Sequence, residues 1–182
     1  MSALRIVLAV TALAIAYGIA HDHVTVRIAP EYFTVLHPRI IESESPNALA
    51  FAWGFAATWW MGLGLGLLLA ACCRMGARPK RTLRDVAPLL GIIVALLPVV
   101  AAVAAFAGRE VAAAIGPDAL LRDARIASER RLDVITVFSA HVAVEVVGAA
   151  ALVALSVHSW RMRGLLASRR AANPPNPSDS AA

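Results

Sequence analysis

Residues 134–160, VITVFSAHVAVEVVGAAALVALSVHSW, form an apolar run in which the ionisable side chains are only His141, Glu145 and His158. A helix rises 1.5 Å per residue, so about 20 apolar residues cross a hydrocarbon layer about 30 Å thick. Apolar runs of this length are typical of membrane spans rather than of soluble cores. The stretch therefore predicts a transmembrane helix.

Three further apolar stretches precede this one. They cover about residues 4–20, 48–73 and 86–108. Together the four stretches predict an all-α membrane protein, a bundle of four transmembrane helices that forms a single domain over residues 1–170. The polar and Pro-rich residues 171–182 predict a disordered cytoplasmic tail.

The composition agrees with a membrane protein. Apolar residues make up 59% of the 182 residues and charged residues only 16%, whereas soluble domains average about 45–50% and about 25%. A soluble enzyme is therefore disfavoured. The two cysteines, Cys72 and Cys73, are adjacent, so they predict no disulfide framework.

The first apolar stretch is the shortest and has two interpretations. Arg5, the apolar residues after it, and the small residues Gly18 and Ala20 before His21 also match a secretory signal peptide cleaved after Ala20. We favour a retained membrane anchor. Either alternative leaves His21 on the same side of the membrane.

The distribution of charge predicts the orientation. One side of the membrane carries 10 basic and 2 acidic residues. They are Arg5 and the charged residues of the connection between the second and third stretches and of the segment after Trp160. The connections 21–47 and 109–133 together carry 7 basic and 9 acidic residues. The positive-inside rule therefore places both termini in the cytoplasm of a bacterial inner membrane. Topology accounts for the formal charge of +5, so the predicted partner is the lipid bilayer and not a nucleic acid.

The connection 21–47 is predicted to cap the outer end of the bundle. His23, Thr25 and Arg27 alternate with apolar residues. Strict alternation is typical of a strand. We therefore expect a small non-helical or short β cap on the outer side.

Side chains able to bind a ligand are concentrated at this outer end. The candidates for a polar or ligand site are His21, Asp22, Glu31, Tyr32, His37, His141 and Glu145. The candidate ligands for a transition metal are His21, His23, Glu31, His37 and His141. Neutral imidazoles and carboxylates suit zinc, copper or iron. The alternative is that these groups are solvated or paired with Arg27 and Arg39.

Haem is not favoured as a cofactor. Haem in a four-helix membrane protein needs histidines that face each other from different helices. His141 and His158 lie on one predicted helix, and the second and third stretches contain no histidine.

Glu145 is the most unusual residue. A helix that enters the membrane near Val134 or Ile135 places His141 roughly 9 Å deep and Glu145 roughly 15 Å deep. An ionised carboxylate at that depth costs about 3 kcal/mol, so we expect Glu145 to face the bundle and to be paired or protonated. His141, four residues earlier on the same face, is one expected partner. A proton or cation pathway and a metal site are alternatives.

Gly62 and Gly66 form a GxxxG step in the second stretch. Small residues let two helix backbones approach closely in a membrane. The step predicts close packing inside the four-helix bundle or, alternatively, a homodimer face.

Several short stretches of the sequence carry a family resemblance. They are HDHVTVR (21–27), EYFT (31–34), HP (37–38) and, further on, WG (53–54) and ATWW (57–60) with Gly62. They resemble "HDQ(V/I)TxR … EYFT … HP … WG..ATWW.G", the pattern of a group of uncharacterised small bacterial integral membrane proteins. The resemblance covers roughly the first 80 residues well and the remainder weakly. It implies a four-helix membrane fold and no particular activity.

The resemblance also implies a shared site. Its residues would be His21, Asp22, Glu31, His37 and His141. This chain departs from the pattern at His23, where glutamine is more usual, and at Glu145, where a non-acidic residue is expected.

Three functions fit these observations. We favour a non-enzymatic accessory or ligand-binding protein, with a larger membrane complex or a second copy of the chain as partner. One alternative is a metal-binding membrane protein or metalloenzyme that uses His and Glu ligands. The other is a small proton or ion transporter that uses Glu145.

Overall fold

The computed structural model describes residues 2–172 of the chain. The helices are α1 (Ser2–Ile28), α2 (Pro30–Thr34), α3 (Pro46–Arg74), α4 (Leu83–Ile115), α5 (Pro117–Leu120) and α6 (Ser128–Ala172). No strand occurs in residues 2–172. The helices α1, α3, α4 and α6 are each long and apolar enough to cross a membrane. The prediction of an all-α chain with four such helices is confirmed, and it fits a multi-pass membrane protein.

The ends of the predicted domain differ slightly from the sequence interpretation. Ala171 and Ala172, assigned to the tail from the sequence, continue α6. The rest of the predicted disordered tail, residues 173–182, lies outside the described residues.

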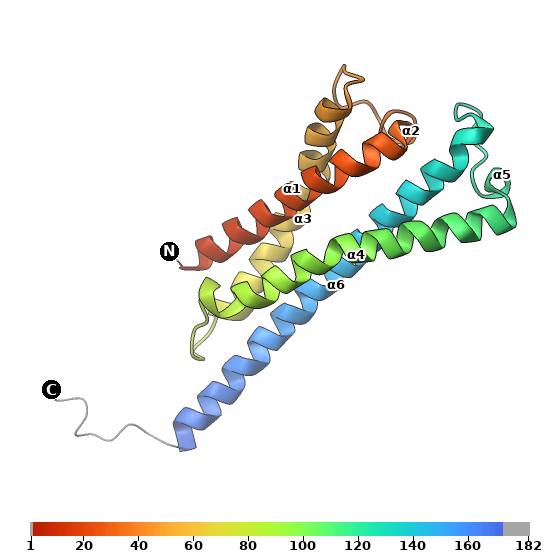
Figure 1. Cartoon of the computed structure of the whole chain (residues 1–182). Coiled ribbons are helices and arrows are strands. Elements are labelled where there is room, and N and C mark those ends of the chain that lie inside the picture. The colour runs from red at the N-terminus through yellow and green to blue at the C-terminus, as the bar shows by residue number, and fades with distance from the viewer. Residues whose placement is uncertain (1, 173–182) are drawn as a thin grey trace.

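The four long helices form two pairs (Figure 1). α1 packs along α3, α4 packs along α6, and the pairs are joined mainly by contacts between α3 and α6. The start of α1, the α3–α4 connection and the last turns of α6 lie at one end of the bundle. α2 and α5 lie at the other end, which we call the α2 end.

Glycines let α1 and α3 pack backbone against backbone. A Cβ atom on Gly54 would lie 2.5 Å from the Cα of Ile19. A Cβ on Gly62 would come within 2.8 Å, and one on Gly66 within 3.1 Å, of atoms of α1. The glycine face of α3 is therefore covered by α1 of the same chain. In a lipid bilayer the hydrophobic effect does not drive helices together, so the van der Waals contacts of such a close approach stabilise the pair instead.

A buried arginine holds the α3–α4 connection at the opposite end. The Arg163 side chain of α6 is fully buried. Its guanidinium donates hydrogen bonds of 2.7–3.1 Å to the carbonyl oxygens of Cys72, Met75, Arg78 and Pro79. The end of α3 is the negative end of its helix dipole, so it favours this cation. Arg163 thus joins the end of α3 to α6.

The predicted β cap is wrong, because residues 23–28 continue α1. The buried residues Gly18, Asp22, Thr25 and Val26 recur with the period of a helix, and they form the face that α1 turns inward. Two of these buried residues, Asp22 and Thr25, are polar. The apolar residues of the segment taken alone therefore alternate as in a strand, although the segment is a helix. The cap consists instead of α2 and the irregular residues 35–45.

The α2 helix seals the α2 end of the bundle. Tyr32 and Phe33 are buried in one apolar cluster with Leu49 of α3 and Val134 and Val137 of α6. Burial of these rings holds α2 against both helix pairs. It also directs Tyr32 toward the polar residues described below.

We predict that Gly54→Ala lowers the free energy of unfolding by about 1–3 kcal/mol, because its methyl group meets the backbone of α1 and forces the helices apart. The matched control is Gly64→Ala, whose Cβ has no neighbour within 4 Å. Since alanine favours helix over glycine, the control should be neutral or stabilising. Unfolding in detergent, followed by circular dichroism, measures both variants. Equal stability of the two would contradict the packing described.

Candidate functional site

A hydrogen bond between Asp22 of α1 and His141 of α6 joins the two helix pairs. Both side chains are buried, and Oδ1 of Asp22 lies 3.1 Å from Nε2 of His141. The other ring nitrogen of His141, Nδ1, lies 3.0 Å from the carbonyl oxygen of Val137. A carbonyl oxygen can only accept, so Nδ1 carries a hydrogen.

This arrangement requires one proton between His141 and Asp22. Either Nε2–H donates to the carboxylate, or a protonated carboxyl group donates to a bare Nε2. The contact is therefore a pair that holds a single proton in the interior of the bundle.

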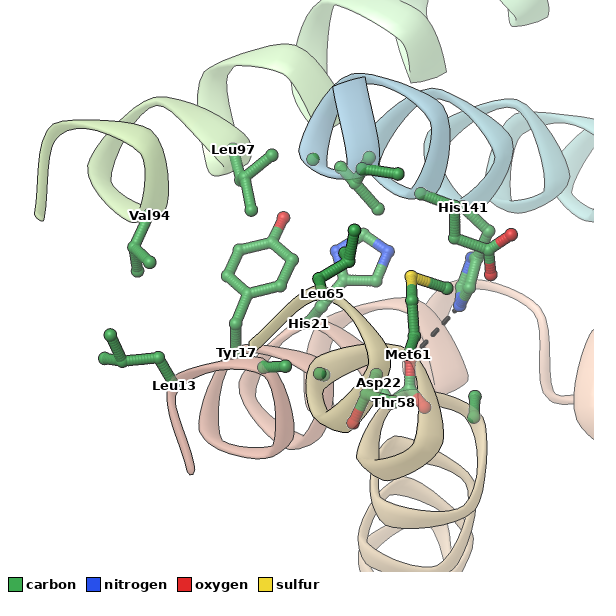
Figure 2. A pocket seen from close by; sticks show the side chains of 18 of the residues that line it. Leu13, Tyr17, His21, Asp22, Thr58, Met61, Leu65, Val94, Leu97 and His141 are labelled. Atoms are coloured by element: carbon green, nitrogen blue, oxygen red, sulfur yellow. Dashed lines mark hydrogen bonds and ion pairs between the residues drawn. The ribbon is translucent and has the colours of Figure 1, made fainter. Parts of the chain in front are cut away.

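His21 completes a cluster of three groups with Asp22 and His141. One nitrogen or oxygen atom from each of the three residues lies within 4.8 Å of the other two. The rings of His21 and His141 meet edge to face, with centroids 4.6 Å apart. Figure 2 shows His21 beside the Asp22–His141 bond. Nε2 of His21 is buried and has no hydrogen-bond partner within residues 2–172.

Aromatic rings extend from the cluster on both sides. The ring of Tyr32 lies 4.4 Å from that of His141, and the ring of His37 lies 4.7 Å from Tyr32 and 5.0 Å from Trp53. On the other side, Tyr17 stacks on His21 at 5.7 Å. The rings form a continuous row that connects α1, α6, the cap and α3.

Tyr32 contributes a hydrogen-bond donor beside His141. Burial raises the pKa of its hydroxyl group, and the negative charges of Glu145 and Asp22 raise the pKa further. The phenol therefore stays protonated at neutral pH. It lines the same cavity as the cluster.

The cluster borders a cavity of about 170 Å³ between the two helix pairs. Figure 2 shows the apolar side chains Leu13, Val94 and Leu97 on one side of this cavity, and His21 and His141 on the other. The cavity thus has an apolar body and a polar end. His37 and Glu145 line it as well.

Glu31 lies outside the cluster. Its carboxylate accepts hydrogen bonds of 2.8 and 3.2 Å from Arg130 of α6, which also pairs with Asp133. The hydrogen bond from Arg130 lowers the pKa of Glu31. Glu31 therefore ties α2 to α6.

His23, a candidate metal ligand, also lies away from the cluster. Its ring packs edge to face on Phe51 of α3, with centroids 5.0 Å apart, and its Nδ1 lies 2.7 Å from the carbonyl oxygen of Ile19. Of the five predicted metal ligands, the cluster contains His21 and His141. Its third member, Asp22, was a candidate for the polar site only.

Glu145 differs from expectation. Its side chain is exposed, lines the cavity, and makes no hydrogen bond or ion pair with the described part of the chain. The expected pairing with His141 is wrong, because Nε2 of His141 contacts Asp22 and its Nδ1 contacts a backbone carbonyl.

Arg27 and Arg39 were the alternative partners of the candidate residues, and the structure gives both of them other partners. Arg39 pairs with Glu42 and Glu44 at 3.6 and 3.7 Å. Arg27 instead donates a hydrogen bond of 2.5 Å to Asn47. Neither arginine contacts the cluster.

Tyr17 was not among the site residues predicted from the sequence. Its hydroxyl group is buried without a hydrogen-bond partner in residues 2–172, and it lines the cavity. Tyr17 precedes His21 by four residues, so the two share one helix face. That spacing was the available signal.

Comparisons with protein-family models, with curated proteins and with solved structures found no match for this chain.

We predict that Glu31→Gln lowers the free energy of unfolding by about 1 kcal/mol at pH 7, because the ion pair with Arg130 is lost. The pKa of Glu31 is lowered in the folded protein, so the pair contributes fully above the ordinary value of 4.5. Its contribution disappears as the pH falls through the lowered pKa. Thermal unfolding of the variant and the parent from pH 7 to pH 3 measures the difference.

The control for this prediction is Glu42→Gln. Glu42 and its partner Arg39 are both mostly exposed at 3.6 Å, so this change should have little effect at any pH. A Glu31→Gln difference that does not change with pH would show that the charge is not responsible.

Proposed function

We propose that this chain is a non-enzymatic ligand-binding or accessory protein of a bacterial inner membrane, which holds a small amphipathic molecule in the cavity between its two helix pairs. The proposal rests on buried polar groups that have no hydrogen-bond partner within the described residues. Nε2 of His21 and the hydroxyl of Tyr17 are buried without a partner, and both line the cavity. Native proteins leave few such groups, because each costs about 1–3 kcal/mol.

The lining specifies the chemistry of the ligand. Apolar side chains surround most of the cavity, which suits a hydrocarbon body. The hydroxyl group of Tyr32 supplies a donor at the polar end, and that of Tyr17 supplies a second donor on the side of Leu97 (Figure 2). Both suit a ligand oxygen that accepts hydrogen bonds. A molecule that dissolves in the bilayer and carries a hydroxyl or carbonyl group has both properties.

The proposed orientation has both termini in the cytoplasm, so that the α2 end faces the outside. The excess of basic residues in the α3–α4 connection and after Trp160 supports it. In this orientation the cluster lies nearer the outer surface. The ligand would be presented there to a larger membrane complex or to a second copy of the chain.

We predict that alkaline phosphatase, which is active only outside the cytoplasm, is active when inserted after Glu42 and inactive when inserted after Gly76. Green fluorescent protein at the same two positions should give the opposite result, since it fluoresces in the cytoplasm. The reverse pattern in both reporters would overturn the proposed orientation.

We predict that a brominated fatty alcohol, 12-bromododecanol, quenches the fluorescence of Trp53 in a saturable manner. Trp53 lines the cavity, and bromine quenches an indole at contact. Phenylalanine at the other three tryptophans, Trp59, Trp60 and Trp160, makes Trp53 the only fluorophore of this type.

Variants of the cavity test where the probe binds. Ala149→Phe places a ring in the cavity and should abolish saturable quenching, whereas Ala150→Phe, at an exposed neighbouring position, should leave it unchanged. Tyr17→Phe removes one donor and should weaken binding about five-fold, which corresponds to about 1 kcal/mol. Equal quenching in the Ala149 and Ala150 variants would mean that the probe binds elsewhere, and the proposal would fail.

A further inference from the structure

We propose that His21, Asp22 and His141 bind a divalent transition-metal ion of the zinc class at the polar end of the cavity. The inference rests on the proposed function and deepens it, because it names the group to which a ligand oxygen would bind. Two imidazole nitrogens and one carboxylate oxygen are donors that zinc and its neighbours prefer in proteins.

The geometry of the cluster is close to what an ion requires. Metal–ligand distances near 2.1 Å place two ligand atoms of a tetrahedral ion roughly 3.4 Å apart. The Asp22 and His141 atoms are already 3.1 Å apart, and all three donors lie within 4.8 Å of one another. The remaining gap requires a movement of the His21 ring toward the pair, and no hydrogen bond of its Nε2 within residues 2–172 opposes this movement.

His141 is oriented in the way that a metal ligand is. Its Nδ1–H donates to the carbonyl oxygen of Val137, which directs Nε2 toward Asp22. Metal-binding histidines usually donate their second ring nitrogen to a carbonyl or carboxylate, which fixes the tautomer. The backbone of α6 therefore prepares Nε2 as a donor.

A hydrogen bond between Asp22 and His141 would by itself explain two of the three residues. It does not explain His21, which adds an unused nitrogen to a buried pair. A metal ion uses all three groups. Three protein ligands leave the fourth position of a tetrahedral ion open, and the three residues all line the cavity.

Metal binding displaces the proton that Asp22 and His141 share. The hydrogen between Nε2 and Oδ1 leaves to solvent as a proton, and bonds from the metal to Nε2 and Oδ1 replace it. One proton is therefore released for each ion bound, and affinity falls as the pH falls. The other titratable groups that line the cavity are Tyr17, Tyr32, His37 and Glu145.

The test uses the full chain in mild detergent, without a histidine tag and after removal of metal by a chelator. Co²⁺ is the first probe, because its visible absorption reports coordination number, and Zn²⁺ should then displace it. We expect one ion per chain and, from calorimetry in two buffers of different ionisation enthalpy, release of about one proton per ion.

Variants identify the ligands. His21→Gln, Asp22→Asn and His141→Gln should each weaken Co²⁺ binding at least ten-fold. The matched control is His23→Gln, which changes a histidine two positions from His21 that packs on Phe51, and it should bind Co²⁺ as the parent does. His21→Gln is decisive if the other two variants do not fold, because Nε2 of His21 makes no hydrogen bond in residues 2–172 that the change would remove.

Absence of Co²⁺ and Zn²⁺ binding by the parent chain, or equal binding by the His21→Gln variant, would overturn the metal site. If the parent chain still binds 12-bromododecanol in the cavity, the proposed ligand-binding function stands without the metal. Loss of both would remove both proposals.

Discussion

The hydrogen bond between Asp22 and His141 is the contact on which the α2 end of the bundle depends. It joins residues 119 positions apart and connects two helix pairs that otherwise meet mainly through α3 and α6. A carboxyl group or an imidazole buried alone costs several kcal/mol, so neither residue is stable in this interior without the other. The cavity, the position of His21 and the row of aromatic rings all follow from where this bond holds α1 against α6.

Much of the helical architecture was predictable, because a membrane span must be apolar over its whole length. The cap was not, since α1 turns Asp22 and Thr25 inward and its helical period is carried partly by polar residues. The sequence counts those residues as solvent-facing, so the apolar residues 24, 26 and 28 looked like one side of a strand. In the structure, Val26 is buried while Val24 is exposed, as a helix requires.

The sequence predicted which types of residue form the site, but not which of these residues contact one another. His21, Asp22 and His141 were candidates because such residues are rare near membrane helices, but the contact across 119 residues depends on how the helix pairs meet. Glu31 and His23 were indistinguishable from them in sequence. Glu31 finds its partner, Arg130, at the start of α6, whereas His23 contacts the carbonyl oxygen of Ile19 one turn earlier in α1. Depth alone singled out Glu145, and depth does not tell which side of a helix faces the protein.

The arrangement around Arg163 has a consequence for how the chain is made. Its guanidinium binds carbonyl oxygens of the α3–α4 connection, which leaves the ribosome about 85 residues earlier. Until α6 is synthesised, those oxygens lack Arg163, and the connection is held only by its own hydrogen bonds, from Lys80 and the backbone N–H of Arg81 to carbonyl oxygens at the end of α3. The four hydrogen bonds that join the end of α3 to α6 can therefore form only after the last helix has been made.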